Sequence, residues 1–330
     1  MRTEDMIGLY HGGLPDFVAP FLAAPELRRL ADVGMNCGCE YTAFPMFRGL
    51  PPYSRLDHSL GAALIVWHFT ADRAQTLAAL FHDIATPPFA HAVDFLRGDH
   101  LRQEATEEGT EELLRSSRTI GVLLEALGLT VEDVADYHRD PVADNDTPRL
   151  SADRLEYTMG NLLGFGFCTR AELGEMYRRL TVTEAPDGAP ELAFTDPAAA
   201  LAFGRGALRC SRVYVSDEDR WAMQALAELL GFAMRRGGLT EADLRGTEPA
   251  VIARLTGDAA TRRRWQAYRV MHEMVYEDVP AGAGRVIPAK KRYIDPLITG
   301  AGRLSDQSAE FRREMEAFLA ASQDGVLYAR

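Results

Sequence analysis

Two adjacent residues with metal-binding side chains, His82 and Asp83, end an apolar stretch and precede a pair of prolines, Pro87 and Pro88. A helix cannot continue through two prolines, so we expect the histidine and the aspartate to lie at a helix terminus. Imidazole and carboxylate groups together suit a divalent first-row metal ion. The stretch therefore predicts part of a metal site and requires partners elsewhere in the chain.

Further candidate ligands are His58 and Asp153. The spacing of apolar residues predicts a helix over 54–69, with His58 near its start, and a following helix with His82 near its end. An antiparallel arrangement of these helices would bring the two histidines together. Asp153 follows Ser151, a residue type that often caps helix N-termini. Each ligand alone has a simpler interpretation as a packed histidine or a capping aspartate, and only the combination is specific.

The order of these residues and their neighbours resembles the HD superfamily of metal-dependent phosphohydrolases. The resemblance is strong over about residues 50–165 and is carried by 53–61, 82–91 and 151–157. These three stretches look most like the deoxynucleoside-triphosphate triphosphohydrolase (dGTPase-like) branch. A C-terminal stretch, 290–296, looks more faintly like a phosphate-contacting segment of some relatives.

The resemblance implies that His58, His82, Asp83 and Asp153 bind one divalent metal ion. Manganese, iron, magnesium, nickel and cobalt are all compatible with this mixed set of ligands. The ion would acidify a water molecule and neutralise charge on a phosphoryl group. The expected activity is therefore hydrolysis of a phosphate ester or anhydride, with a nucleotide as the substrate.

Three further residues match positions that act on the phosphate in such enzymes. Arg55, one helical turn before His58, is expected to hold a phosphate group. His91 is expected to transfer a proton at the reacting phosphate, and Asp94 lies three residues later, where it can orient the imidazole. The simpler interpretations are a surface arginine and a hydrogen-bonded structural histidine.

Lys290, Lys291 and Arg292 form a dense cationic group in a chain whose net charge is −12. Local positive charge of this kind favours binding of a polyanionic nucleotide, although a solvated loop is the simpler alternative. The acidic balance argues against a general nucleic-acid-binding surface. We therefore expect a small-molecule nucleotide partner.

The chain also departs from typical triphosphohydrolases. Thr86 stands where relatives usually carry a second histidine, and Gln103 stands where a histidine is expected before a glutamate. The substrate can therefore differ from a triphosphate. Two alternatives stay open: a non-catalytic nucleotide sensor, and a diiron HD-domain oxygenase in which His100 and His138 would supply additional ligands.

The expected fold is all-α, with an HD-domain helical core, one small β-hairpin and a helical C-terminal extension. We divide the chain into an irregular N-terminal segment (1–49), the metal-binding core (50–175) and a hairpin with helices packed on that core (176–330). The hairpin strands are predicted at 180–184 and 191–195. The other helices are predicted at 24–34, 72–84, 89–96, 104–114, 120–127, 130–137, from 151, and at 197–213, 217–236, 258–279 and 305–321.

Composition predicts a cytoplasmic protein. The 330-residue chain is 47% hydrophobic and contains four cysteines, too few for a disulfide framework at this length. Its first residues are acidic and unlike a signal peptide, and no apolar run approaches the roughly 18 residues that would cross a bilayer. We expect no membrane partner, and the chain could form a homo-oligomer.

Overall fold

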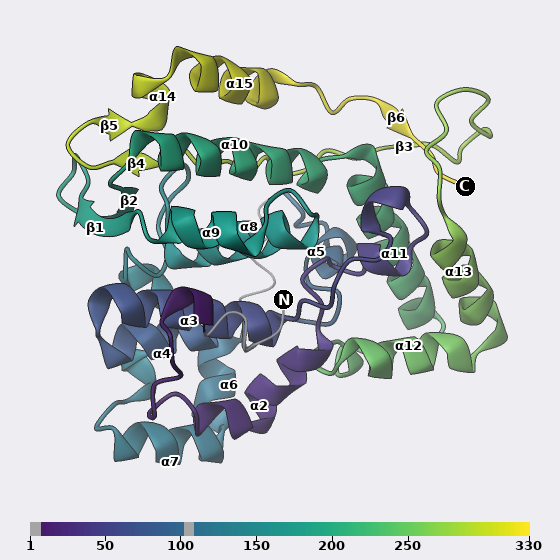
Figure 1. Cartoon of the computed structure of the whole chain (residues 1–330). Coiled ribbons are helices and arrows are strands. Elements are labelled where there is room, and N and C mark those ends of the chain that lie inside the picture. The colour runs from purple at the N-terminus through teal and green to yellow at the C-terminus, as the bar shows by residue number, and fades with distance from the viewer. Residues whose placement is uncertain (1–7, 102–108) are drawn as a thin grey trace.

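Helices make up most of the structure, which confirms the mainly helical prediction. The computed structural model describes residues 8–101 and 109–330. Figure 1 shows successive layers, in which α15 (Ala309–Ala320), α10 (Pro197–Tyr214) and the pair α8 (Ala152–Gly164) and α9 (Arg170–Tyr177) lie above α3 (Arg55–Thr70) and α4 (Arg73–Phe81). Neighbouring layers are in contact. Helices α11 to α13 lie to one side of these layers.

Two helices joined by a tight turn, α3 (Arg55–Thr70) and α4 (Arg73–Phe81), form the base of the candidate site and pack on each other. The N-terminus of α3 has a reciprocal capping box, in which the Ser54 hydroxyl accepts from the Asp57 amide and the Asp57 carboxylate accepts from the Ser54 amide. Asp72 caps α4 in turn. These caps define where each helix begins and so fix the height of the side chains in its first turn.

Helix α8 (Ala152–Gly164) packs against α3 and begins at the N-cap Ser151. Gly160 lies where α8 meets Tyr53, because a Cβ at this glycine would lie only 2.5 Å from the tyrosine ring and hydroxyl. The absence of a side chain at Gly160 therefore lets the residue just before α3 pack against α8.

Short strands add to the predicted hairpin, so the expectation of a single hairpin was incomplete. The larger sheet has the order β1-β2-β4-β5, with β2 and β4 parallel and the other pairs antiparallel. The additional strands have two residues each and are too short to show the alternating pattern by which strands are recognised. The strands are β1 (Leu180–Glu184), β2 (Pro190–Phe194), β3 (Arg285–Val286), β4 (Leu297–Ile298), β5 (Gly302–Arg303) and β6 (Val326–Leu327), and β3 pairs with β6.

The remaining helices have the following bounds. The other α-helices are α2 (Pro25–Arg28), α5 (His91–Arg97), α6 (Thr110–Ser116), α7 (Arg118–Ala126), α9 (Arg170–Tyr177), α10 (Pro197–Tyr214), α11 (Asp217–Arg235), α12 (Glu248–Gly257), α13 (Ala259–Val270), α14 (Leu304–Gln307) and α15 (Ala309–Ala320). The 3-10 helices are η1 (Phe21–Ala23), η2 (Arg29–Asp32), η3 (Cys39–Tyr41), η4 (Pro45–Phe47), η5 (Val131–Asp133), η6 (Tyr137–Arg139) and η7 (Asp243–Arg245).

Several predicted helices differ from the observed ones. The prediction of a long helix over 258–279 was wrong beyond Val270, where α13 ends. The chain after α13 instead runs alongside the last residues, where the Val275 amide donates to the Tyr328 carbonyl at 2.7 Å. The helix predicted over 130–137 is replaced by the short turns η5 and η6. The helix predicted over 305–321 is interrupted at Ser308, whose side chain caps α15. The chain after Val270 leaves the helix because it pairs with the last residues of the chain. Local helix propensity does not reveal such pairing between distant segments.

Hydrophobic side chains from all three predicted segments share the largest core cluster, which includes Tyr10, Leu64, Leu155 and Phe311. A second cluster gathers around α5 and α11 to α13. The predicted segment boundaries stay a prediction. Within 8–101 and 109–330, no helix combines the length and apolar character needed to cross a membrane.

Candidate metal centre

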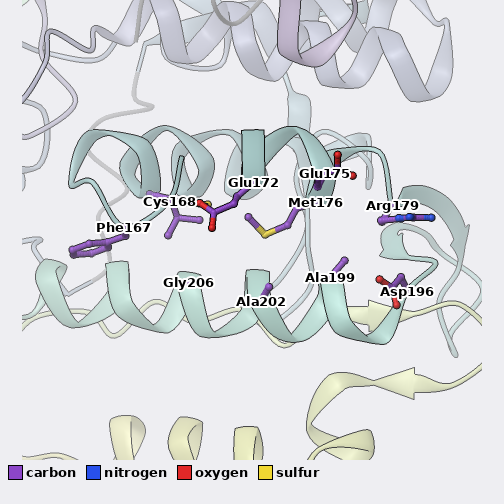
Figure 2. A pocket seen from close by; sticks show the side chains of 11 residues that line it. Phe167, Cys168, Glu172, Glu175, Met176, Arg179, Asp196, Ala199, Ala202 and Gly206 are labelled. Carbon is purple, nitrogen blue, oxygen red and sulfur yellow. The ribbon is translucent and has the colours of Figure 1, made fainter. Parts of the chain in front are cut away.

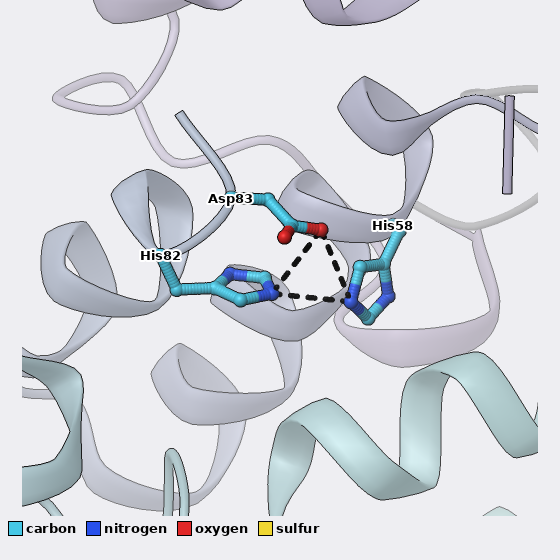
Figure 3. A group of neighbouring side chains, drawn as sticks. All are labelled: His58, His82 and Asp83. Carbon is cyan, nitrogen blue, oxygen red and sulfur yellow. Dashed lines mark hydrogen bonds and ion pairs between the residues drawn. The ribbon is translucent and has the colours of Figure 1, made fainter. Parts of the chain in front are cut away.

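Three predicted ligands meet where α3 begins and α4 ends. Each of His58, His82 and Asp83 offers one ligand atom, and these atoms lie within 4.8 Å of one another (Figure 3). The Nε2 atoms of His58 and His82 are 3.1 Å apart. Asp83 Oδ2 lies 3.8 Å from His58 Nε2 and 3.6 Å from His82 Nε2.

The fourth predicted ligand, Asp153, comes from the first turn of α8. Its Oδ1 lies 3.0 Å from His58 Nε2 and 3.6 Å from His82 Nε2. The Asp153 side chain is 20% exposed, whereas those of His58 and His82 are 2% and 5% exposed. The fold thus brings the four residues together and leaves the more open side next to Asp153.

The remaining nitrogen of each imidazole is held by the protein. His58 Nδ1 lies 2.5 Å from Glu156 Oε2, and this buried carboxylate also accepts from the Tyr53 hydroxyl. His82 Nδ1 lies 2.7 Å from the Ala79 carbonyl oxygen. Both imidazoles therefore direct Nε2 towards the cluster, and partners of this kind fix ring orientation in metal sites.

Glu156 was missed by sequence reasoning. The signal that points to it is its place three residues after Asp153, because residues at this spacing share one face of a helix.

The charges at the cluster fit a bound cation. Burial by itself would lower the pKa of His58, but its bonds to Asp153 and Glu156 outweigh burial and raise that pKa to about 10. Burial opposes ionisation of Asp83 as well, yet Arg55 and the two histidines hold its pKa well below the usual range. Two imidazoles and two carboxylates have the donor types and the charge to bind a divalent metal ion, which would take the place of the proton on His58.

Both oxygens of Asp83 are bonded to neighbouring side chains. Arg55 Nη1 donates to Oδ2 at 2.8 Å, and Thr86 Oγ1 donates to Oδ1 at 2.7 Å. The Arg55 side chain is 8% exposed. Thr86 thus orients a predicted metal ligand. The predicted phosphate-binding role of Arg55 stays a prediction.

His91 opens α5 and is bonded through both of its nitrogens. Asp94 Oδ2 lies 2.8 Å from Nδ1, and Arg292 Nη2 lies 3.3 Å from Nε2. Burial is the main cause that lowers the pKa of His91, and the charges of Arg292 and Arg55 act in the same direction. We therefore assign a neutral ring that donates from Nδ1 to Asp94 and accepts at Nε2 from Arg292.

The three residues of the predicted cationic group, Lys290, Lys291 and Arg292, have different surroundings. Arg292 also hydrogen-bonds with Tyr157, which lies four residues after Asp153 in α8. Lys291 Nζ donates to the Leu319 and Ala321 carbonyl oxygens at the end of α15, at 2.6 and 2.5 Å. Lys290 is exposed. Arg292 thus connects this group to the candidate site.

The additional histidines have other partners. The His100 ring stacks on Phe95 at 4.4 Å between centroids. His138 Nδ1 lies 2.9 Å from Asp144 Oδ2, and its ring lies 4.4 Å from that of Tyr137. Neither belongs to the group of potential ligands that the described residues form. Gln103 lies outside the described residues.

A separate cavity of about 470 Å³ lies between α9 and α10 (Figure 2). It contains none of the predicted site residues. Its lining consists of Leu162, Phe167, Cys168, Glu172, Glu175, Met176, Arg179, Asp196, Ala199, Ala202 and Gly206.

Comparison with known proteins supports the chemistry of the cluster. No protein-family model matches the chain. The metal-dependent phosphohydrolase Cns2 of Cordyceps militaris is 24% identical over 285 residues, which cover 83% of this chain and 78% of that protein. The chain is a relative of a metal-dependent phosphohydrolase.

A second relative is the uncharacterized protein YdhJ of Bacillus subtilis. It is 25% identical over 113 residues, or 34% of each chain. The match to Cns2 extends over most of this chain and supports a metal-dependent phosphohydrolase. It does not distinguish the deoxynucleoside-triphosphate branch from others.

Proposed function

We propose that the protein is a metal-dependent phosphohydrolase that cleaves a phosphate ester or anhydride bond of a nucleotide. The observation that carries the proposal is the convergence of His58, His82 and Asp83, whose ligand atoms lie within 4.8 Å of one another, with Asp153 beside them. The match to a phosphohydrolase over most of the chain supports the same chemistry.

The four ligands would hold one divalent ion, which would lower the pKa of a water molecule and neutralise charge on a phosphoryl group. Glu156 and the Ala79 carbonyl keep His58 and His82 in the orientation that ligation requires. Arg55 and Thr86 do the same for Asp83.

His91 is the candidate for proton transfer. Its lowered pKa keeps the imidazole neutral near pH 7, so Nε2 can accept a proton at the reacting phosphate. Asp94 holds the opposite nitrogen and stabilises the imidazolium that proton uptake would create. Arg292 lies beside Nε2, where its guanidinium could bind a phosphate oxygen and bring the phosphate next to the imidazole.

A nucleotide substrate is supported by the positions of the cations. Arg55 contacts the predicted ligand Asp83 and Arg292 contacts His91, within a chain of net charge −12. Both are arginines, whose planar guanidinium groups match phosphate oxygens bidentately. Lys290 and Lys291 remain candidates for the more distant part of the substrate, although Lys291 would have to leave the α15 carbonyls.

Metal analysis of the purified protein tests the site. We expect about one metal ion per chain in the wild type, because four ligands with open positions suit a mononuclear hydrolytic site. Asp83→Ala should lose the metal, whereas Glu175→Ala, which removes an exposed carboxylate on α9, should retain it. Equal metal content in the wild type and Asp83→Ala would overturn the assignment. Two irons per chain would instead favour the oxygenase alternative.

A substrate screen tests the reaction. Deoxynucleotides, ribonucleotides, nucleoside monophosphates and cyclic dinucleotides should be supplied with manganese, iron, magnesium, nickel and cobalt in turn. The released product, whether orthophosphate, triphosphate or a nucleotide, identifies the scissile bond. Binding of nucleotides without turnover under every metal would favour the sensor alternative and contradict the proposal.

A further inference from the structure

A buried carboxylate outside the metal cluster connects three distant segments of the chain. Glu248 is the first residue of α12 and is 2% exposed. Its Oε1 accepts from the amides of Gly34 at 2.8 Å and Phe89 at 3.3 Å. Its Oε2 accepts from the Tyr41 hydroxyl at 2.8 Å. Three donors therefore satisfy a carboxylate that is almost completely buried.

The Gly34 side of this junction leads to the start of α3. Gly34 forms an antiparallel bridge with Ser54, the N-cap of α3. One residue further along, the Arg55 amide donates to the Val33 carbonyl at 2.8 Å. The backbone that Glu248 holds is thus paired with the turn that carries Arg55 and a predicted metal ligand.

The Phe89 side leads to His91. Phe89 and Ala90 both have positive φ, at 64° and 42°. Residues with a Cβ rarely adopt such angles, which are strained and persist only where surrounding contacts impose them. The bond from the Phe89 amide to Glu248 is such a contact, and the strained pair determines the direction in which α5 and His91 begin.

We propose that Glu248 is a positioning residue for His91: one carboxylate oxygen holds the strained Phe89–Ala90 turn against the segment paired with α3, so that His91 meets Arg292 beside the metal centre. This inference rests on the proposed function, because it gives Glu248 a part in proton transfer at the phosphate. Glu248 itself touches neither the metal ligands nor His91, and it acts through the two backbone amides.

Two variants separate positioning from general stability. Glu248→Ala leaves both amides without their acceptor, whereas Glu248→Gln keeps a carbonyl oxygen that can accept from both. The matched control is Glu241→Ala, which removes an exposed ion pair with Arg97 of the same helix α5. Exposed ion pairs contribute little, so this control should behave as the wild type.

The measurements are kcat and KM with p-nitrophenyl phosphate and bis(p-nitrophenyl) phosphate, metal content, and hydrogen exchange of the metal-free protein. In Glu248→Ala we expect kcat to fall about 10- to 100-fold, with a smaller change in KM, because misplacement of a catalytic group affects the chemical step. Metal content should be unchanged, and the Phe89 and Gly34 amides should exchange about tenfold faster. Glu248→Gln should restore kcat and slow exchange.

Unchanged kcat in Glu248→Ala would overturn the inference. So would equal losses of kcat and metal in both Glu248 variants, since this would show a purely structural role. If the wild type hydrolyses no phosphate ester, the proposed function fails. In that case, amide exchange at Phe89 and Gly34 still tests whether Glu248 holds the Phe89–Ala90 turn. If these amides exchange in Glu248→Ala as slowly as in the wild type, the positioning role of Glu248 is overturned as well.

Discussion

Glu156 connects the metal centre to the aromatic residues beneath it. Its carboxylate is fully buried, and it bonds His58 on one side and the hydroxyls of Tyr53 and Tyr10 on the other. Burial raises the pKa of Glu156, while the bonds from His58 and Tyr53 lower it. A negative charge at this depth is stabilised by the same imidazole that it orients.

We expect Glu156→Gln to weaken metal binding about 10- to 100-fold, as is typical when the partner of a ligating histidine is changed. The amide can still accept from His58 Nδ1 but no longer makes the ring more basic. Competition with a metallochromic chelator measures the affinity. Glu175→Gln serves as the control, because Glu175 is an exposed carboxylate that pairs with Arg178. An affinity equal to that of the wild type would show that the charge of Glu156 has no influence on the metal.

His91→Gln should lower kcat about 10²- to 10⁴-fold, the usual contribution of general acid–base catalysis, and leave the metal content unchanged. Asp94→Asn should also lower kcat, because an amide in place of the carboxylate no longer fixes the Nδ1 proton. Steady-state kinetics and metal analysis of the same preparations check both effects. Loss of metal in His91→Gln would indicate that His91 supports the ligands and not the proton transfer.

At the level of single residues, the sequence predicts much of the candidate site. The spacing of His58, His82, Asp83 and Asp153 led to four side chains that the structure brings together. The partners of these ligands were not predictable in the same way. Contacts such as the one from Thr86 to Asp83 depend on which rotamers the surrounding packing selects.

The helices of the site are positioned by small residues as well as by caps. Gly160, one turn after Glu156 in α8, leaves room for the Tyr53 ring, and a Cβ there would lie 2.5 Å from it. Gly164, the last residue of the same helix, has no atom within 4 Å of the position that a Cβ would take. Close packing against Tyr53 therefore requires a glycine at position 160, whereas the packing at position 164 leaves room for a side chain.

We expect Gly160→Ala to destabilise the protein by about 1–3 kcal/mol, because overpacking displaces Tyr53 and with it the bond to Glu156. Metal affinity should fall at the same time. Gly164→Ala should be neutral or stabilising by up to about 1 kcal/mol, since alanine favours helices. Chemical denaturation measures both. Equal stability of the two variants would show that Tyr53 moves aside without cost.

The elements were predictable where the pattern is local. Helix α3 and strand β1 begin and end close to their predicted residues because capping residues and alternating side chains mark them. Helix α5 begins at His91 and not at Phe89, since the positive φ values of Phe89 and Ala90 exclude them from a right-handed helix. That backbone is fixed in part by Glu248, 159 residues away, and no local pattern shows such a contact.

Two buried carboxyl groups near the second core cluster have raised pKa values. Burial raises the pKa of Asp219 to about 8, although a bond from Cys39 and the charge of Arg220 oppose the shift. Burial and the neighbouring Glu248 raise the pKa of Glu40 to about 8 as well. Glu40 belongs to η3 and Asp219 to α11, and these two helices are in contact.

These groups should make the whole molecule less stable as the pH rises. Between about pH 4 and pH 8 the folded state holds a proton on Asp219 that the unfolded chain has released, so the free energy of unfolding falls with pH. Asp219→Asn should reduce this slope by about 1 kcal/mol per pH unit. Denaturant unfolding at pH 6 and pH 8 measures it. Glu184→Gln, at an exposed position, is the control, and identical slopes in all three proteins would contradict the prediction.

The contact between His91 and Arg292 joins residues that are 201 positions apart, whereas the predicted metal ligands all lie between His58 and Asp153. Chains emerge from the ribosome in order, and contacts between distant residues form late because closing a long loop costs entropy. During synthesis the ligand set is therefore complete before Arg292 has been made. A nascent chain that ends shortly after Asp153 would carry every predicted metal ligand and would still lack the arginine that contacts His91.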